Sequence, residues 1–253
     1  MSQLIANTFP ARPTQGGRFN PDILIGDWRY QPKYNGWRAF IDLPEDQVFN
    51  RHGEPMSIGD CFRRAIDSIR EDCLAVGIRY LDAEALERRF DSCRGALILL
   101  DIPDCTEPLE TRMEMLSYLA PVHDVNKAPE PNTVLTTPTF GEAEARTMWT
   151  WLQQLNNAYG FEIYEGLVAK KAGSEYPVSW SANDTFKDWV KFRFDQFRSR
   201  RQLYQGGKLV AQGDKIAAQR WRDQGESDIR PLRSGMGEAV DNYAAMHGID
   251  HMR

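Results

Sequence analysis

The sequence is poor in cysteine and histidine, and this scarcity argues against a zinc site or a disulfide framework. Only four of the 253 residues are cysteine and only four are histidine. The cysteines are widely spaced, with no Cys-x-x-Cys pair and no histidines at ligand spacing beside them. We therefore expect free thiols in a reduced, cytosolic protein.

Long apolar runs and a strong charge of one sign are also missing. No apolar run approaches membrane-spanning length, and residues 1–7 lack the basic flank and apolar centre of a signal peptide. The net charge is -5, so no overall positive field attracts nucleic acid. A local basic surface suffices for phosphate contacts, however, which keeps nucleic-acid enzymes under consideration. We expect a cytoplasmic monomer with no membrane partner.

The composition that remains is typical of a globular protein, with 42% hydrophobic and 26% charged residues and no low-complexity tract. A chain of this length can form one large domain, or one domain with a small appendage. The character of the sequence changes after residue 195. We therefore predict a main domain over residues 1–195 and a small, partly helical domain over residues 196–253.

Apolar periodicity predicts a succession of helices and strands after a Pro- and Gly-rich lead-in over residues 1–27. Apolar residues recur every three or four positions over residues 58–76 and 141–159, which predicts amphipathic helices. A proline near its first turn marks another helix from residue 108, before a Pro-rich connection over residues 121–140. Strands are expected around Trp28 and Tyr30 and over residues 37–41, 79–87, 96–102, 163–170 and 186–194, and residues 47–55 are expected to form a short strand that ends in a turn. The tail is expected to form a hairpin across Gly206-Gly207 and helices over residues 214–223 and 238–247.

Lys33 is the first candidate for a chemical role. It lies between two β-prone runs, and Gly36 supports a tight turn there, so we predict a lysine at a hairpin. A lysine held by rigid walls can act as a nucleophile where burial or nearby cations lower its pKa. The alternative is an exposed loop lysine without a catalytic role.

Other charged residues are ambiguous when read one at a time. Asp82 and Glu84 are two positions apart and should share one face of a strand, where paired carboxylates are more often solvated than catalytic. Lys191 and Arg193 point the same way along their strand, and a buried face with two cations needs an anionic partner. Arg51, in a turn, is equally compatible with a solvated side chain and with a functional one.

Taken together, six segments resemble those of the covalent nucleotidyltransferase superfamily, which comprises ATP-dependent DNA ligases, RNA ligases and mRNA capping enzymes. The segments, in the family's order, are Lys33-Tyr34-Asn35-Gly36-Trp37-Arg38, Asn50-Arg51-His52-Gly53, Leu81-Asp82-Ala83-Glu84, Leu100-Asp101-Ile102, Glu165-Gly166-Leu167-Val168-Ala169-Lys170 and Trp189-Val190-Lys191-Phe192-Arg193. A further segment, Pro108-Leu109-x-x-Arg112, resembles the helix start that follows in DNA ligases. The resemblance covers residues 30–194.

The resemblance implies an α/β (α+β) fold, in which antiparallel sheets flanked by helices enclose the nucleotide. Residues 1–195 would form the adenylation domain, and residues 196–253 a small C-terminal domain without an evident full OB-fold. By resemblance, Lys33 attacks the α-phosphorus of ATP to give a lysyl-adenylate and pyrophosphate. The adenylyl group then passes to a 5′-phosphate at a strand break, and a 3′-hydroxyl displaces AMP.

The resemblance also implies roles for the other charged residues. Lys170 and Lys191 would lie against the α-phosphate and form the catalytic set with Lys33. Glu84 would bind the ribose, and Glu165 together with Glu84 would hold Mg²⁺, which prefers carboxylate and phosphate oxygens. Further contacts to the nucleotide are implied for Gln31, Arg38, Arg51 and Arg193.

Five positions depart from the family pattern. Asn35 stands where DNA ligases usually have aspartate, Ala83 replaces a glycine, and Gln31 stands where an acidic residue is common. Arg193 replaces a lysine. Leu100 occupies a position that is commonly aromatic and stacks on adenine, so adenine stacking would have to come from another side chain.

The first interpretation is an ATP-dependent DNA ligase that seals nicked duplex DNA in replication or repair. The alternative is an RNA ligase of the same superfamily, because the roughly sixty residues of the tail are too few for a comfortable oligonucleotide-binding barrel. A third possibility is a non-catalytic nucleic-acid-binding relative. A capping enzyme ranks low, because the sequence offers no barrel with that family's last motif.

Overall fold

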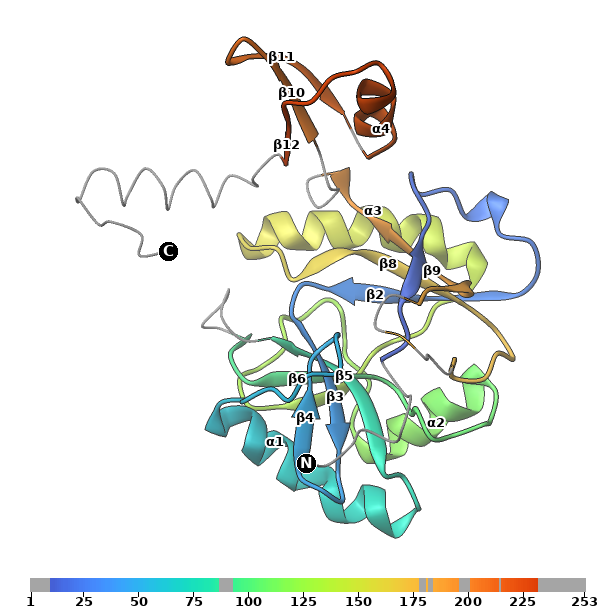
Figure 1. Ribbon diagram of the computed structural model, residues 1–253. Helices are drawn as coiled ribbons and strands as arrows, with labels where there is room; N and C mark the ends of the chain where they lie inside the picture. Colours follow the sequence, from blue (N-terminus) through green and yellow to red (C-terminus); the bar gives the residue numbers. More distant parts are fainter. Residues whose placement is uncertain are drawn as a thin grey trace. The chain divides into compact units, whose positions relative to one another are not determined.

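The computed structural model describes residues 10–86, 93–177, 181, 184–195, 201–213 and 215–231. The chain divides into two compact units, Met1–Arg193 and Phe194–Arg253, each with its own sheet or sheets (Figure 1). Antiparallel-rich sheets flanked by helices confirm the predicted fold class. Within the described ranges, no helix has the length and apolar character needed to cross a bilayer.

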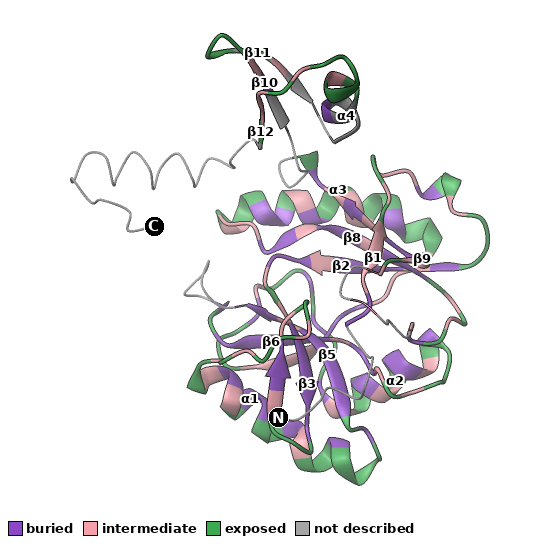
Figure 2. Cartoon of the chain, in the orientation of Figure 1, coloured by how far each residue is buried: buried purple, intermediate pink, exposed green. Residues whose placement is uncertain are grey.

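The first unit contains a five-stranded sheet that packs on two helices. Its strands, in spatial order, are β4 (Gln47–Phe49), β3 (Trp37–Asp42), β5 (Tyr80–Leu86), β6 (Ala96–Asp101) and β7 (Val134–Thr136). Neighbouring strands are antiparallel except β6 and β7. Side chains of β3, β5 and β6 form one apolar cluster with α1 (Asp60–Ala75) and α2 (Leu109–Leu119). Figure 2 shows these strands as a buried layer, whereas the helices alternate between buried and exposed positions.

A four-stranded sheet forms the other layer of the first unit. Its order is β1 (Pro13–Gln15), β9 (Phe186–Arg193), β8 (Tyr164–Lys171) and β2 (Trp28–Tyr34). A short 3-10 helix, η1 (Pro21–Ile23), lies between β1 and β2 in the sequence. Helix α3 (Glu142–Tyr159) contacts β8 and β2. The helices predicted over residues 58–76 and 141–159 are therefore confirmed, whereas β7 was missed because it lies inside the Pro-rich connection.

The chain changes sheets between Tyr34 and Trp37, and the predicted hairpin is wrong. Lys33 lies within β2, which pairs with β8, whereas the next strand, β3, pairs with β4 and β5. Between the two strands, Asn35 is hydrogen-bonded next to one sheet and Gly36 is hydrogen-bonded to the other. Asn35 donates its backbone N–H to Ile163 O at 2.8 Å, and Gly36 donates its own to Glu84 Oε1 at 3.0 Å. These distant partners prevent β2 and β3 from folding back on each other.

The second unit has a three-stranded sheet and one helix in its described part. The strands are β10 (Arg201–Gln205), β11 (Lys208–Gly213) and β12 (Ile229–Pro231), with β10 in the centre, and the helix is α4 (Lys215–Asp223). The antiparallel pairing of β10 with β11 confirms the hairpin predicted across Gly206-Gly207. The sequence did not predict β12. The helix predicted over residues 238–247 lies outside the described residues.

Candidate functional site

A pocket between the two sheets of the first unit collects all nine residues that the sequence singled out. They are Gln31, Lys33, Arg38, Arg51, Glu84, Glu165, Lys170, Lys191 and Arg193. Strands β2, β8 and β9 supply one wall, and β3, β5 and β6 supply the other. Each of the six segments quoted above contributes at least one lining residue, although the segments are spread over 160 positions of the chain.

The pocket is strongly cationic. Its lining includes seven lysines and arginines and only two carboxylates, in a chain whose net charge is -5. The cations are Arg12, Lys33, Arg38, Arg51, Lys170, Lys191 and Arg193, and the carboxylates are Glu84 and Glu165. Such an excess of positive charge in a partly enclosed space favours a ligand with several negative charges, such as a polyphosphate.

Lys33 and Glu165 form an ion pair in this pocket. Strands β2 and β8 are antiparallel with Lys33 opposite Gly166, so the preceding residue, Glu165, lies within reach of the lysine. Lys33 Nζ is 2.5 Å from Glu165 Oε2, and Arg193 Nε is 3.2 Å from the same oxygen. Burial by itself would raise the pKa of Glu165, but Lys33 and Arg193 outweigh it and lower the pKa. Glu165 therefore stays ionised.

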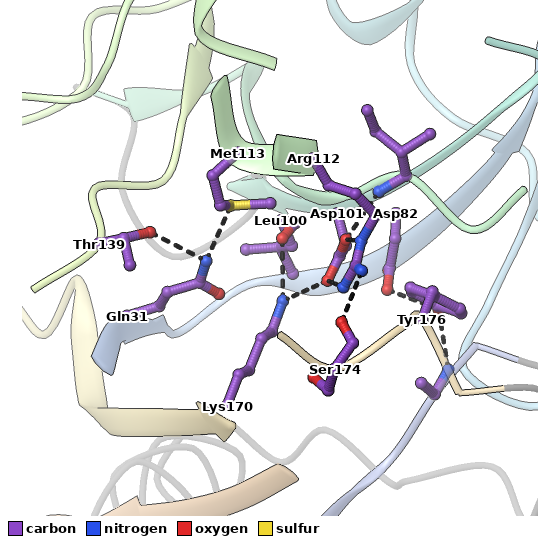
Figure 3. Close-up of polar contacts among 12 residues, drawn as sticks. Gln31, Asp82, Leu100, Asp101, Arg112, Met113, Thr139, Lys170, Ser174 and Tyr176 are labelled. Atoms are coloured by element: carbon purple, nitrogen blue, oxygen red, sulfur yellow. Dashed lines mark hydrogen bonds and ion pairs between the residues drawn. The ribbon is translucent and has the colours of Figure 1, made fainter. Parts of the chain in front are cut away.

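Lys170 is buried and belongs to a second ionic cluster (Figure 3). Its Nζ is 2.7 Å from Asp101 Oδ2, donates to Leu100 O at 3.0 Å and lies 4.0 Å from the centre of the Trp189 ring. Asp101 also accepts from Arg112 Nε at 2.6 Å. Burial would raise the pKa of Asp101, but the two cations lower it. One carboxylate shared by two cations leaves the cluster with a net positive charge beside the pocket.

Asp82 is not solvated, contrary to the reading favoured from the sequence. It is fully buried, forms an ion pair with Arg38 and accepts a hydrogen bond from the Tyr176 hydroxyl at 2.8 Å. Glu84, two positions on, lines the pocket instead. Burial raises the pKa of Glu84 to about 7, although Lys33 and Arg38 act in the opposite direction. Asp82 thus belongs to a buried ionic cluster, whereas Glu84 faces the pocket.

Lys191 is surrounded by other cations. Burial is the largest cause that lowers its pKa, to about 8, and Arg193, Lys33, Arg12 and Arg38 lower it further. A phosphate placed among these side chains would relieve their mutual repulsion.

The apolar part of the pocket is lined by aliphatic and ring side chains, Pro32, Leu100, Val168 and Trp189 among them. Gln31 lies beside them and is buried. Its Nε2 donates to Met113 Sδ at 3.0 Å and to Thr139 Oγ1 at 3.3 Å (Figure 3). This arrangement fixes the orientation of the amide at the pocket wall.

Sequence reasoning assigned no site role to Arg12 or Trp189, which also line the pocket. Arg12 lies in the lead-in segment and reaches the pocket only because β1 pairs with β9. Trp189 was part of a quoted segment but had no role, and its indole N–H is buried without a hydrogen-bond partner in the described part of the chain. No local pattern marks either residue, since both depend on pairing with distant strands.

The carboxylates of the pocket fit a magnesium ion that is held jointly with a nucleotide. Among the described residues, no three histidine, cysteine or acidic side chains come together as a metal cage. Mg²⁺, however, commonly binds through one or two carboxylates together with substrate phosphates. Glu84 and Glu165 supply such a pair in one pocket.

Comparison with known proteins identifies ligases as similar proteins. No protein-family model matches the chain. DNA ligase C1 of Mycolicibacterium smegmatis is 26% identical over 98 residues, which is 39% of this chain and 28% of the relative. The matched region thus spans little more than a quarter of that relative's length.

Three similar solved structures are also ligases. A Lig E DNA ligase has 13% identity and a TM-score of 0.49, over 77% of this chain and 72% of the other. The ligase domain of M. tuberculosis LigD has 14% identity and a TM-score of 0.48, over 83% and 73%. An archaeal ATP-dependent RNA ligase has 13% identity and a TM-score of 0.43, over 72% and 48%.

The six nucleotidyltransferase-like segments of the sequence each contribute to one cationic pocket, where the lysine of the first segment contacts the glutamate of the fifth. A lysine, carboxylates and further cations in one pocket can support phosphoryl-group chemistry.

Proposed function

We propose that the chain is an ATP-dependent polynucleotide ligase that acts through a lysyl-adenylate on Lys33, most specifically a DNA ligase that seals nicked duplex DNA. The observation that carries the proposal is the position of Lys33, beside Glu165 in a pocket with six other cationic residues. A ligase of this kind would serve DNA replication or repair.

The pocket has an apolar part and a cationic part, and each is suited to one part of ATP. The apolar part, with Leu100 and Val168, would accept the base, and the cationic part would accept the phosphates. The amide N–H groups of Gln31 are directed to Met113 and Thr139, which leaves its carbonyl oxygen as an acceptor for an exocyclic amine. Adenine carries such an amine at the position where guanine carries an oxygen, so Gln31 favours ATP over GTP.

The chemistry would begin with removal of a proton from Lys33, since only the free amine is nucleophilic. The proton leaves to solvent, and Glu165 Oε2, 2.5 Å from Nζ, positions the lysine side chain before the nucleotide binds. The amine then forms a bond to the α-phosphorus, the bond to the bridging oxygen breaks, and pyrophosphate leaves with the electron pair. Lys191 and Arg193 would neutralise the oxygens in this step. Mg²⁺, held by Glu165 and Glu84 with the phosphates, would supply further neutralisation when bound.

Two features of the sequence favour DNA over RNA as the substrate. They are the turn that carries Arg51 and the Pro108-Leu109-x-x-Arg112 segment, both of which resemble DNA ligases. Arg112 supports the site through its ion pair with Asp101, which in turn holds Lys170.

An RNA ligase is the second candidate, and the strand content of the described part of the second unit supports it. The described part of that unit has three strands and one helix, fewer strands than the five of an oligonucleotide-binding barrel. The two candidates share the chemistry on Lys33 and differ only in the polynucleotide that receives AMP.

Intact-protein mass spectrometry after incubation with ATP and Mg²⁺ tests the chemistry. We expect a mass increase of one AMP on the wild-type chain and none on Lys33→Ala. Lys171→Ala is the matched control, because Lys171 is an exposed lysine on the neighbouring strand and does not line the pocket. AMP that persists on Lys33→Ala would show that another residue is the nucleophile.

Sealing assays then distinguish the substrates. We expect the wild-type chain to join nicked duplex DNA more efficiently than broken RNA. Sealing of RNA alone would replace the DNA assignment with the RNA one. A wild-type chain that takes up no AMP but binds nucleic acid would be a non-catalytic relative.

A further inference from the structure

The segment of residues 10–16, here called the N-terminal strap, is tied along the edge of the four-stranded sheet. Strand β1 pairs in parallel with β9, with Gln15 opposite Lys191. Gly16 N donates to Lys191 O at 2.9 Å, and Phe186 N donates to Arg12 O at 3.1 Å. The backbone of Arg12 is therefore fixed beside the strand that carries Lys191.

A second set of contacts fixes the residue before Arg12. Ala11 is fully buried, and its N–H donates to the Tyr176 hydroxyl at 2.9 Å. Its carbonyl accepts from Arg38 Nη2 at 3.1 Å. Because Tyr176 and Arg38 are both bound to the buried carboxylate of Asp82, the strap is anchored to the five-stranded sheet as well. Arg12 thus lines the pocket from a backbone that is held on both sides.

The strand order places Arg12 far from Lys33 across the sheet. The order is β1, β9, β8, β2, with Arg12 directly before β1 and Lys33 on β2. Strands are about 4.8 Å apart, so β1 and β2 are separated by about 14 Å across the sheet. Lys191, on β9, lies between them. The pocket therefore has a row of cations that begins at Lys33 and ends at Arg12.

The geometry of phosphoryl transfer indicates how ATP would lie along this row of cations. In an in-line displacement, the leaving group departs on the side opposite the attacking atom. If Lys33 attacks the α-phosphorus, the terminal phosphates of ATP point away from β2 and toward the β1 edge. An arginine at that edge can bind a phosphate through two parallel hydrogen bonds.

We infer that Arg12, presented by the N-terminal strap, forms a subsite for the two terminal phosphates of ATP and for the pyrophosphate that leaves. The inference rests on the proposed function for the placement of the α-phosphate at Lys33. It adds a binding residue from a part of the chain that lies outside the six family-like segments.

Isothermal titration with AMP, ATP and inorganic pyrophosphate, in buffer without divalent cations, tests the subsite. For Arg12→Ala we expect about tenfold weaker binding of ATP and of pyrophosphate, which corresponds to about 1.4 kcal/mol, and AMP affinity within about twofold of wild type. Arg12→Gln, which keeps most of the side-chain length, should behave in the same way. Arg18→Ala is the matched control, because it removes an exposed arginine of the lead-in that does not line the pocket.

The three ligands separate a local effect from general damage to the pocket. Equal losses for AMP and ATP, or no loss for either, would overturn the subsite, as would a wild-type chain that does not bind pyrophosphate. A wild-type chain that binds pyrophosphate in an Arg12-dependent way but never attaches AMP would refute the proposed function and leave the subsite standing. If the wild-type chain attaches AMP but Arg12→Ala binds pyrophosphate as tightly as wild type, the proposed function would stand and the subsite would be refuted.

Discussion

The ammonium group of Lys33 lies 2.5 Å from the carboxylate oxygen Oε2 of Glu165. The candidate nucleophile and the candidate metal ligand therefore neutralise each other when no nucleotide is present. The pair is only partly exposed, at 18% and 17% of the two side chains, so solvent does not fully screen it. Attack on a phosphate requires this pair to separate, and Arg193, 3.2 Å from the same oxygen, is positioned to retain the carboxylate.

Removal of the Glu165 charge should slow formation of the lysyl-adenylate. For Glu165→Gln we expect a decrease of at least about 100-fold in the rate, because the partner that positions Lys33 and a carboxylate ligand for Mg²⁺ are lost together. The measurement is the time course of the AMP-modified mass. Glu175→Gln is the control, since Glu175 is exposed and outside the pocket. A rate close to wild type in Glu165→Gln would contradict this role.

The buried carboxylate of Asp101 should be essential for stability. For Asp101→Asn we expect a loss of about 3–5 kcal/mol in the free energy of unfolding, because Lys170 and Arg112 would remain buried without a full counter-charge. Chemical denaturation followed by tryptophan fluorescence measures it.

Asp46 provides a matched comparison for Asp101. It also pairs with two cations, Arg63 and Arg70, but its side chain is 54% exposed, whereas that of Asp101 is 0% exposed. Asp46→Asn should therefore lower the free energy of unfolding by less than about 1 kcal/mol. Similar losses in the two variants would show that burial does not govern these ion pairs.

Gly166 should tolerate no side chain. Its φ is +148°, and an added Cβ would lie 2.0 Å from the backbone oxygen of Phe192, which cannot move without breaking the pairing of β8 with β9. We expect Gly166→Ala to lower the free energy of unfolding by more than about 3 kcal/mol. Gly173→Ala, at φ +64° with no atom within 4 Å, should cost only about 1 kcal/mol. Thermal unfolding of both variants provides the comparison, and a milder effect at Gly166 would be inconsistent with this packing.

The affinity for ATP should fall as the pH rises through 8. The pKa of Lys191 is about 8 in the free protein, below its ordinary value, and a bound phosphate would raise it. Binding near this pH therefore takes up a proton, and affinity decreases with rising pH by up to about tenfold per unit. Titrations at pH 7.5, 8.25 and 9 measure the slope. Lys191→Arg should remove the contribution of Lys191 to this pH dependence, because arginine stays charged. An unchanged slope in that variant would show that another group takes up the proton.

Much of the architecture follows from local patterns in the sequence. The helices α1 and α3 were predicted because apolar residues recur at helical spacing, and β6 because its apolar run is continuous. The nine candidate site residues were proposed from the resemblance of six short segments to a known family, and all nine line one pocket. Local spacing was sufficient for the helices and strands, whereas the site residues also required the family resemblance.

Three features depended on contacts between distant residues, and the sequence did not reveal them. The turn after Lys33 moves the chain to another sheet because Asn35 and Gly36 bond to different distant strands. The buried positions of Asp82 and Asp101 depend on the cations that tertiary packing brings to them. Arg12 enters the pocket only through the pairing of β1 with β9.

The sequence by itself therefore determined which chemical groups the protein carries and the order in which they occur. Only the tertiary structure decided which of those groups are paired, how far each is removed from water, and which residues line the pocket. The physical reason is that periodicity and turn chemistry act over a few residues, whereas strand pairing and desolvation depend on partners more than a hundred positions away.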